Sequence, residues 1–162
     1  MADKRALAEK LVAVCTQSGD MIATAESCTG GLIAGAITDI SGSSSVLDRG
    51  FVTYSNDAKT QMLGVAEDLI AHHGAVSAPV AEAMALGAIQ HSRAAISIAV
   101  TGVAGPTGGS ADKPVGTVWF GMCQRGQNPQ SFHRHFAGED RDGVRERTVI
   151  EALEALLGKA AP

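Results

Sequence analysis

An unbroken apolar run at residues 94–102, AAISIAVTG, is the feature that most limits the folds open to this chain. The run has the length of one strand and no polar alternation, which is typical of a strand buried inside a sheet that helices cover on both faces. A shorter apolar run at 21–27 and a β-branched and aromatic run at 50–55 also indicate strands. The chain is therefore expected to build a sheet between layers of helices.

Helical patterns separate these strands. Each pattern has apolar residues near helical spacing or a recognisable cap, such as Ser55 or Asn56 before one helix, and Ser77 with Pro79 before another. The predicted helices cover residues 3–18, 29–41, 56–64, 77–93 and 141–158. Residues 116–124 and 130–138 predict a late antiparallel hairpin. We predict a three-layer α/β/α sandwich with a mixed, mostly parallel sheet, formed by one domain over residues 1–162.

Composition and charge exclude several classes of protein. The 162 residues are 45% hydrophobic and 19% charged, with a formal net charge of -4, so disorder and a global positive field for nucleic acid or anionic membranes are both disfavoured. No apolar run approaches the length of a membrane span. Cys15, Cys28 and Cys123 are well separated, and His133 and His135 have no third ligand at a readable spacing. We expect a cytoplasmic protein without a metal site.

The segment AESCTGG follows the first predicted strand and opens a helix. In open α/β sheets, ligands bind beyond the carboxyl ends of the strands, and free N–H groups at a helix start favour an anion. The hydroxyls of Ser27 and Thr29 and the backbone at Gly30 and Gly31 suit a phosphate, and Glu26 and Cys28 belong to the same segment. The alternative is that Thr29 only caps the helix while the glycines allow close packing.

A glycine-rich loop, TGVAGPTGG, follows the long apolar run. Thr101, Gly102, Ala104 and Gly105 stand directly behind the predicted strand, and the glycines allow the main chain to approach a ligand closely. Long loops in compact domains tend to be functional or mobile. The loop is therefore either a binding loop or a flexible surface segment.

A serine cluster, a tyrosine and a lysine lie close together at residues 41–59. A serine hydroxyl becomes a nucleophile when a neighbouring base removes its proton, and a lysine with a lowered pKa can be that base. Lys59 in the first turn of a helix is the candidate base, and Tyr54 could relay the proton. The alternatives are a solvated helix lysine and a half-buried tyrosine. Cys28 is the rival nucleophile, or else a small buried apolar residue.

Taken together, these segments resemble the C-terminal domain of the competence/damage-inducible CinA family, a domain that also occurs as a stand-alone nicotinamide-nucleotide amidase. The resemblance rests on AESCTGG, GSSSVLDRGFVTYSNDAKTQMLGV, HGAVS, AVTGVAGPTGG, KPVGTV and DRDGVRERTVIEAL, which cover most of the chain. It implies hydrolysis of nicotinamide mononucleotide (NMN) to nicotinate mononucleotide and ammonia in NAD salvage, without a cofactor or metal. It also suggests a homodimer or higher homo-oligomer.

The resemblance assigns the catalytic roles to Ser44 as nucleophile, Lys59 as base and Tyr54 as partner. The choice of Ser44 over Ser43 or Ser45 depends on the family's spacing alone. The nucleotide would bind between the SCTGG and TGVAGP loops. Arg141 and Arg145 share one helical face and could bind the phosphate, or instead pair on the surface with Glu139 and Asp142. A non-catalytic nucleotide-binding module and an amidase that uses Cys28 remain the alternative functions.

Overall fold

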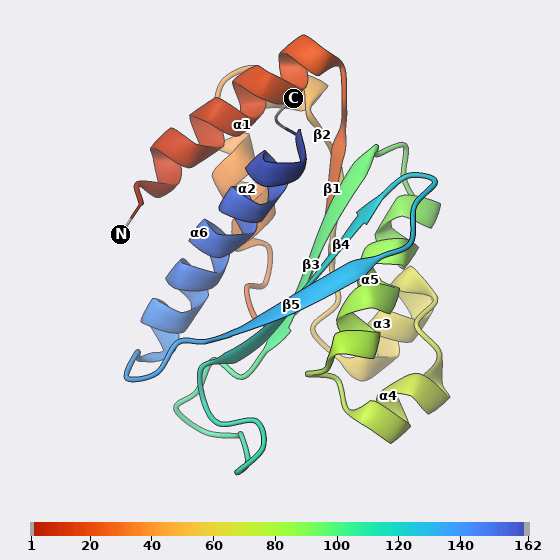
Figure 1. Ribbon diagram of the computed structural model, residues 1–162, viewed down its shortest axis with the longest axis vertical. Helices are drawn as coiled ribbons and strands as arrows, with labels where there is room; N and C mark the ends of the chain where they lie inside the picture. Colours follow the sequence, from red (N-terminus) through yellow and green to blue (C-terminus); the bar gives the residue numbers. More distant parts are fainter. Residues whose placement is uncertain (1, 161–162) are drawn as a thin grey trace.

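The computed structural model describes residues 2–160, over which five strands form one mixed sheet in the order β2-β1-β3-β4-β5 (Figure 1). The strands are β1 (Ile22–Glu26), β2 (Leu47–Val52), β3 (Ile96–Gly102), β4 (Thr117–Gln124) and β5 (Gln130–His135). The helices are α1 (Lys4–Ser18), α2 (Leu32–Thr38), α3 (Asn56–Leu63), α4 (Glu67–His73), α5 (Ala78–Gln90) and α6 (Arg141–Ala160), with a short 3-10 helix, η1 (Ser43–Ser45). β1 pairs in parallel with β2 and β3, whereas β4 is antiparallel to β3 and β5.

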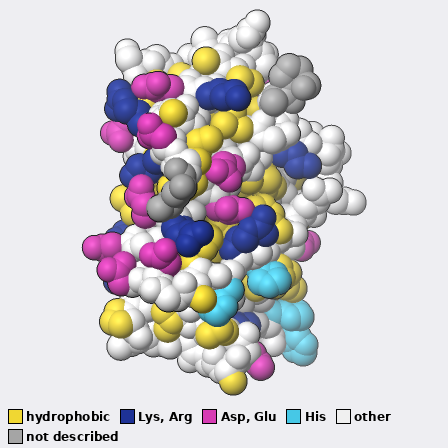
Figure 2. Space-filling model, turned by 60° about the vertical axis from the view of Figure 1, so that its left-hand side comes forward, with side chains coloured by type: hydrophobic (Ala, Val, Ile, Leu, Met, Phe, Trp, Pro, Cys, Tyr) yellow, Lys and Arg dark blue, Asp and Glu magenta, His cyan; other side chains and the backbone are white. Residues whose placement is uncertain are grey.

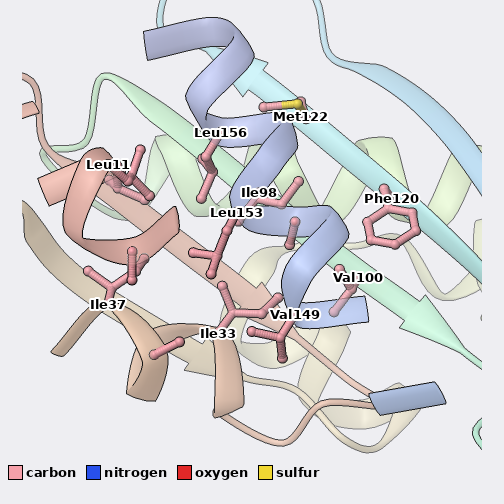
Figure 3. Close-up of a cluster of buried hydrophobic side chains, with 14 of the residues drawn as sticks. Leu11, Ile33, Ile37, Ile98, Val100, Phe120, Met122, Val149, Leu153 and Leu156 are labelled. Atoms are coloured by element: carbon pink, nitrogen blue, oxygen red, sulfur yellow. The ribbon is translucent and has the colours of Figure 1, made fainter. Parts of the chain in front are cut away.

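Helices cover both faces of this sheet. On one face, α1, α2 and α6 enclose a cluster of leucine, isoleucine and valine side chains; Figure 3 shows Val149 and Leu153 of α6 beside Ile98 and Val100 of β3. On the other face, α3, α4 and α5 enclose a second cluster, built mainly from alanine with valine and isoleucine. The predicted three-layer α/β/α fold with a late hairpin is confirmed.

The apolar run at 94–102 is buried on both faces, as its sequence predicts. Along β3, Ile98 and Val100 pack toward α6, and all strand residues except the last are buried. Ser97 faces α5, where its hydroxyl donates a 2.7 Å hydrogen bond to the carbonyl oxygen of Ala85. The buried hydroxyl of Ser97 therefore has a hydrogen-bond partner within the core.

Glycine sets the distance between α5 and its neighbours. A Cβ atom on Gly121 of β4 would collide with the carbonyl oxygen of Ala81, and one on Gly87 of α5 would collide with that of Leu63. Side chains at these two positions would push the helix away from β4 or from α3. The small residues of the sequence therefore serve close packing of backbone on backbone.

The bounds of β2 and α2 and the cap of α5 differ from the sequence-based expectation. β2 begins and ends earlier than the predicted strand at 50–55, which leaves Tyr54 in a loop. α2 is shorter than the predicted helix at 29–41, because Gly30 and Gly31 adopt positive φ angles of 59° and 108° before it. Ser55 caps α3 by accepting a hydrogen bond from Ala58 N, but the hydroxyl of Ser77 donates backward to Gly74 O instead of capping α5.

The three parallel strands end together, and we call this end of the sheet the carboxyl edge. It lies toward the bottom of Figure 1, beside the long loop between β3 and β4. The segments that follow β1, β2 and β3 therefore meet there, whereas residues that precede β2 lie at the opposite, amino edge.

Charges of both signs are mixed on the surface. Figure 2 shows acidic and basic side chains interspersed on one face of the molecule. Ion pairs such as Lys4–Glu146 and Arg147–Glu139 join charges of opposite sign. Within residues 2–160, no helix combines the length and the apolar character needed to cross a bilayer.

Asp48, at the amino edge, should make the stability of the fold depend on pH. Its carboxylate accepts hydrogen bonds from Arg93 N at 2.9 Å and from the side chains of Arg93 and Arg49, and these bonds lower its pKa to about 2. Because the pKa is lower in the folded state, this stabilisation is present above pH 3.8 and is lost as the pH falls through about 2. Asp48→Asn should lower the free energy of unfolding at pH 7 by about 1–2 kcal/mol.

Urea denaturation at several pH values measures this effect. The difference between wild type and Asp48→Asn should shrink between pH 4 and pH 2, and Asp112→Asn, at an exposed aspartate in no ion pair of residues 2–160, should change little. A constant difference across this range would contradict the assignment to Asp48.

Candidate active site

A cavity of about 350 Å³ lies at the carboxyl edge of the sheet. Its walls come from the segments that follow the three parallel strands, together with the start of α6. Ser27 and Cys28 follow β1, Tyr54 and Lys59 follow β2, and most of residues 101–109 follow β3. This is the place at which open α/β sheets bind ligands.

Lys59 is the ionisable group that this cavity buries most deeply. The residue lies in the first turn of α3 and is only 1% exposed. Its Nζ donates hydrogen bonds to Ser27 Oγ at 3.1 Å and to the carbonyl oxygen of Thr53 at 2.9 Å. No ion pair among residues 2–160 includes Lys59, and burial lowers the pKa of its ammonium group. The lysine is not the solvated helix residue of the alternative interpretation.

Ser27 is the hydroxyl that Lys59 reaches. It follows the last residue of β1, and its N–H donates to the carbonyl oxygen of Val100 on the neighbouring strand at 3.0 Å. The side chain is 9% exposed and lines the cavity. Ser27 and Lys59 meet because β1 and β2 are parallel neighbours, so that the segments beyond their ends lie side by side.

The structure does not bring Ser44 and Lys59 together. Ser44 is exposed in η1, which precedes β2, whereas Lys59 comes after the same strand. The length of β2 separates them, so Ser44 lies at the amino edge and does not line the cavity. Ser43 and Ser45 belong to the same 3-10 helix. The expected Ser44–Lys59 contact is thus replaced by a contact between Lys59 and Ser27.

Cys28 lines the cavity, but its thiol is not activated. The predicted helix-start position was expected to lower the pKa of the thiol. Instead, burial raises the pKa to about 12, and the nearby Glu26 carboxylate acts in the same direction. Cys28 is 6% exposed and belongs to the apolar cluster next to α2 and α6. The residue therefore has the environment of a small buried apolar side chain.

Tyr54 and Arg141 bridge the rim of the cavity. Tyr54 is 63% exposed, and its hydroxyl accepts a 3.1 Å hydrogen bond from Arg141 Nη2. Arg141 Nη1 donates to the carbonyl oxygen of Gly105 at 2.7 Å. The expected proton relay from Ser44 or Lys59 through Tyr54 is absent from the described contacts. Tyr54 instead holds a guanidinium group at the cavity mouth.

The start of α2 is already occupied by a carboxylate of the protein. Glu26 is 1% exposed, and its side chain accepts hydrogen bonds from Ile33 N at 2.8 Å, Ala34 N at 3.0 Å and Thr29 Oγ1 at 2.5 Å. Two N–H groups in the first turn of α2 are therefore taken by Glu26, and the N–H of Gly30 donates to the carbonyl oxygen of Ser27. Glu26 and Thr29 do not line the cavity, and neither do Gly30 and Gly31.

The loop after β3 forms the opposite wall. Thr101 is 1% exposed, and its hydroxyl donates to the carbonyl oxygen of Ala75. Gly102 has no room for a Cβ atom, which would meet the Thr117 carbonyl oxygen at 2.9 Å. Ala104 and Gly105 also line the cavity, as expected for a binding loop.

A model of the CinA C-terminal domain matches residues 4–160 of this chain. The chain belongs to the CinA C-terminal domain family. Nicotinamide-nucleotide amidohydrolase PncC of Escherichia coli K12 is 49% identical over 150 residues, which cover 93% of this chain and 90% of that protein. The putative competence-damage inducible protein of Symbiobacterium thermophilum is 47% identical over 162 residues, covering 94% of this chain but 37% of that longer protein.

Solved structures of this CinA family share the fold closely. The crystal structure titled competence/damage inducible protein CihA from Agrobacterium tumefaciens superposes with a TM-score of 0.94 at 49% sequence identity, and the match covers 98% of this chain and 96% of that one. The resemblance drawn from the sequence motifs is confirmed at the level of family and fold.

Sequence reasoning missed two parts of this cavity. Asn56, in the first turn of α3, lines it, and so do Ala75 and Val76, which precede α5. The HGAVS motif contains the latter pair but gives no hint of their position, because no predicted strand leads into it. Among residues 2–160, no group of three or more histidine, cysteine, aspartate or glutamate side chains is placed to hold a metal ion.

Proposed function

We propose that this protein is a nicotinamide-nucleotide amidase that hydrolyses NMN to nicotinate mononucleotide and ammonia, in NAD salvage. The names of its PncC relatives support the substrate. One observation carries the chemistry: a buried lysine amine lies 3.1 Å from the hydroxyl of Ser27, and both line one cavity. The cavity volume, about 350 Å³, is within the range of small-molecule sites.

Ser27 is the nucleophile in this proposal, and Lys59 is its base. Burial without a carboxylate partner favours the uncharged amine, which can accept the Ser27 proton. Ser27 Oγ then attacks the carboxamide carbon, and the carbonyl π electrons move to the oxygen to give a tetrahedral oxyanion. Lys59, now an ammonium, returns its proton to the amide nitrogen, the C–N bond breaks, and ammonia leaves. The product of this half-reaction is the ester of Ser27 with nicotinate mononucleotide, which keeps the ribose and phosphate of the substrate.

The backbone N–H of Cys28 is suited to hold the oxyanion. Cys28 lines the cavity, and among the residues that the structure describes its N–H donates to no other residue. A donor directly after a nucleophile is a common part of an oxyanion hole. In the second half-reaction, Lys59 takes a proton from water, the hydroxide attacks the ester, and Ser27 leaves with a proton from Lys59.

The phosphate of the nucleotide is best matched by Arg141. Its guanidinium lies at the cavity mouth, where its hydrogen bonds go to Tyr54 and to a backbone carbonyl. An incoming phosphate could replace the Tyr54 hydroxyl with a charge-assisted pair. Gly105, Gly108 and Gly109 have positive φ angles of 80° to 84°, so their loop can turn backbone N–H groups toward the same anion.

The two alternative functions make different predictions. A non-catalytic module would bind NMN in the same cavity without turnover. An amidase that uses Cys28 is disfavoured by the raised pKa of the thiol, because a protonated thiol is a poor nucleophile.

Incubating the purified protein with NMN tests the proposed function. We expect stoichiometric release of ammonia and nicotinate mononucleotide, measured by a coupled ammonia assay and by chromatography. Binding of NMN in calorimetry without either product would replace the amidase with the non-catalytic module.

The proposal extends to the context in which the enzyme works. We place it in the cytoplasm as a single amidase domain that forms a homodimer or higher homo-oligomer. The three cysteines, which are buried and free, are compatible with a reducing compartment. Light scattering coupled to size-exclusion chromatography measures the oligomeric state.

A further inference from the structure

We propose that Glu26 and Arg145 are positioning residues that clamp the Ser27 loop from opposite sides and so fix the nucleophile. This inference rests on the proposed role of Ser27. It also replaces the expectation that both residues contact the substrate. Neither side chain lines the cavity, and each bonds to the segment that carries Ser27.

Glu26 holds the inner side of the loop. It is the last residue of β1 and directly precedes Ser27, and its backbone carbonyl accepts a 2.9 Å hydrogen bond from Thr53 N. Its carboxylate reaches forward across the loop to Ile33 N and Ala34 N at the start of α2. One buried side chain thus connects the residue before the nucleophile to the helix after it.

Thr29 closes the same connection in the middle of the loop. Its hydroxyl donates to Glu26 Oε1, and the residue is fully buried. With Thr29, the carboxylate accepts three hydrogen bonds over an eight-residue stretch of chain. Charged acceptors make stronger hydrogen bonds than neutral ones, especially where water is excluded. The loop can therefore move only if a buried carboxylate loses its partners.

Arg145 holds the outer side of the loop. Its Nε donates to the carbonyl oxygen of Cys28 at 3.1 Å, and its Nη2 donates to that of Thr29 at 3.3 Å. These carbonyls belong to the two residues that follow Ser27. Because a peptide unit is planar, holding a carbonyl on one side fixes the direction of the N–H in the same unit. The clamp therefore fixes the peptide unit between Cys28 and Thr29, directly behind the Cys28 N–H that we assigned to the oxyanion.

The burial of the Glu26 carboxylate is not explained by packing alone. A carboxylate that is 1% exposed is costly to desolvate, and an apolar residue in its place would avoid that cost. The charge does not pair with a cation in any ion pair of residues 2–160. All its bonds go to the loop and the helix that flank the nucleophile. A buried carboxylate at this position is explained if catalysis requires the Ser27 loop to be held in one geometry.

Glu26→Gln tests the inner half of the clamp. The amide has the same shape, but its NH₂ group would face an N–H or hydroxyl donor. We expect kcat for NMN to fall at least about tenfold, and KM to stay within about threefold, because the nucleophile is displaced while the binding loop after β3 is unchanged. Hydrogen exchange at the amides of Ile33 and Ala34, measured without substrate, should become faster.

Two substitutions of Thr29 test its hydrogen bond to Glu26. Thr29→Val removes the hydroxyl at constant shape and should lower kcat in the same direction as Glu26→Gln. Thr29→Ser keeps the donor and should retain most of the activity. Equal activity of the serine and valine variants would show that the hydrogen bond to Glu26 does not position Ser27.

Two matched controls remove general instability as an explanation. Asp48→Asn alters another carboxylate that is only 2% exposed, at the amino edge, and should reduce stability without changing kcat at 25 °C. Arg145→Met should lower kcat, whereas Arg147→Met, on the same helix, should not, since Arg147 bonds to Glu139.

The outcomes separate this clamp from the proposed function. Faster exchange with an unchanged kcat in Glu26→Gln would overturn the positioning role. Unchanged exchange at residues 33 and 34 would overturn the clamp itself, whether or not the protein hydrolyses NMN. A wild-type protein that releases no ammonia, yet shows faster exchange in Glu26→Gln, would refute the amidase function while supporting the clamp.

Discussion

Ser27→Ala should abolish the release of ammonia from NMN, lowering kcat/KM by about 10⁴-fold or more. The substitution removes the hydroxyl to which Lys59 donates a hydrogen bond and leaves the cavity otherwise intact. Binding of NMN should persist, because Arg141 and the loop after β3 are unchanged. Turnover is measured by ammonia release and binding by calorimetry. In wild type, mass spectrometry after rapid quenching should detect the ester of nicotinate mononucleotide on the peptide that contains Ser27.

Ser44→Ala is the decisive control for this prediction. Ser44 is exposed at the amino edge and does not line the cavity, so its removal should leave kcat/KM close to that of wild type. Cys28→Ala should keep measurable turnover, which would exclude the thiol as the nucleophile. An inactive Ser44→Ala beside an active Ser27→Ala would reverse our assignment and would require a conformation that brings η1 to the carboxyl edge.

The layers of the fold were predictable because they follow from local patterns. The apolar run of β3, the cap at Ser55 and the helical spacing of α6 each need only a short stretch of sequence. The pairing of Ser27 with Lys59 joins residues 32 positions apart and depends on the order of the strands. One signal was available: Ser27 is the last residue of the predicted strand at 21–27, whereas Ser44 precedes a predicted strand. The strand-end rule therefore favours Ser27.

The roles of Glu26 and the two arginines could not be predicted in this way. A carboxylate next to a helix start can face a ligand or cap the helix, and only the direction of its side chain decides between these. Arg141 and Arg145 lie four residues apart, yet one reaches the cavity rim and the other the back of the Ser27 loop. Small differences in side-chain direction along one helix separate a binding residue from a positioning residue.

Lys59→Met should lower kcat/KM by about 10²–10⁴-fold, because it removes the general base and keeps the volume of the side chain. Lys59→Arg should be similarly inactive, since a guanidinium stays protonated and cannot accept the Ser27 proton. Substantial turnover by the arginine variant would exclude Lys59 as the base. The matched control is Lys113→Met, which removes an exposed lysine bond to His73 O outside the cavity lining.

The same lysine should make both activity and stability rise with pH, activity below its lowered pKa and stability above it. Burial lowers the pKa of Lys59, so wild-type kcat/KM should fall about tenfold per pH unit below that pKa, as the amine is protonated.

The stability of the fold should also depend on the protonation of Lys59. Above the lowered pKa, the folded protein holds a neutral amine while the unfolded chain still binds the proton, so the free energy of unfolding should rise with pH until the ordinary lysine pKa is reached. Lys59→Met avoids the burial of an ionisable group and should melt at a higher temperature than wild type at pH 7, by a margin that narrows as the pH rises. A variant that is more stable but inactive would mean that the buried amine is kept for chemistry at the expense of the fold. A less stable Lys59→Met would instead mean that the hydrogen bonds of Lys59 to Ser27 and Thr53 outweigh the cost of burying its amine. The main role of the amine would then be structural.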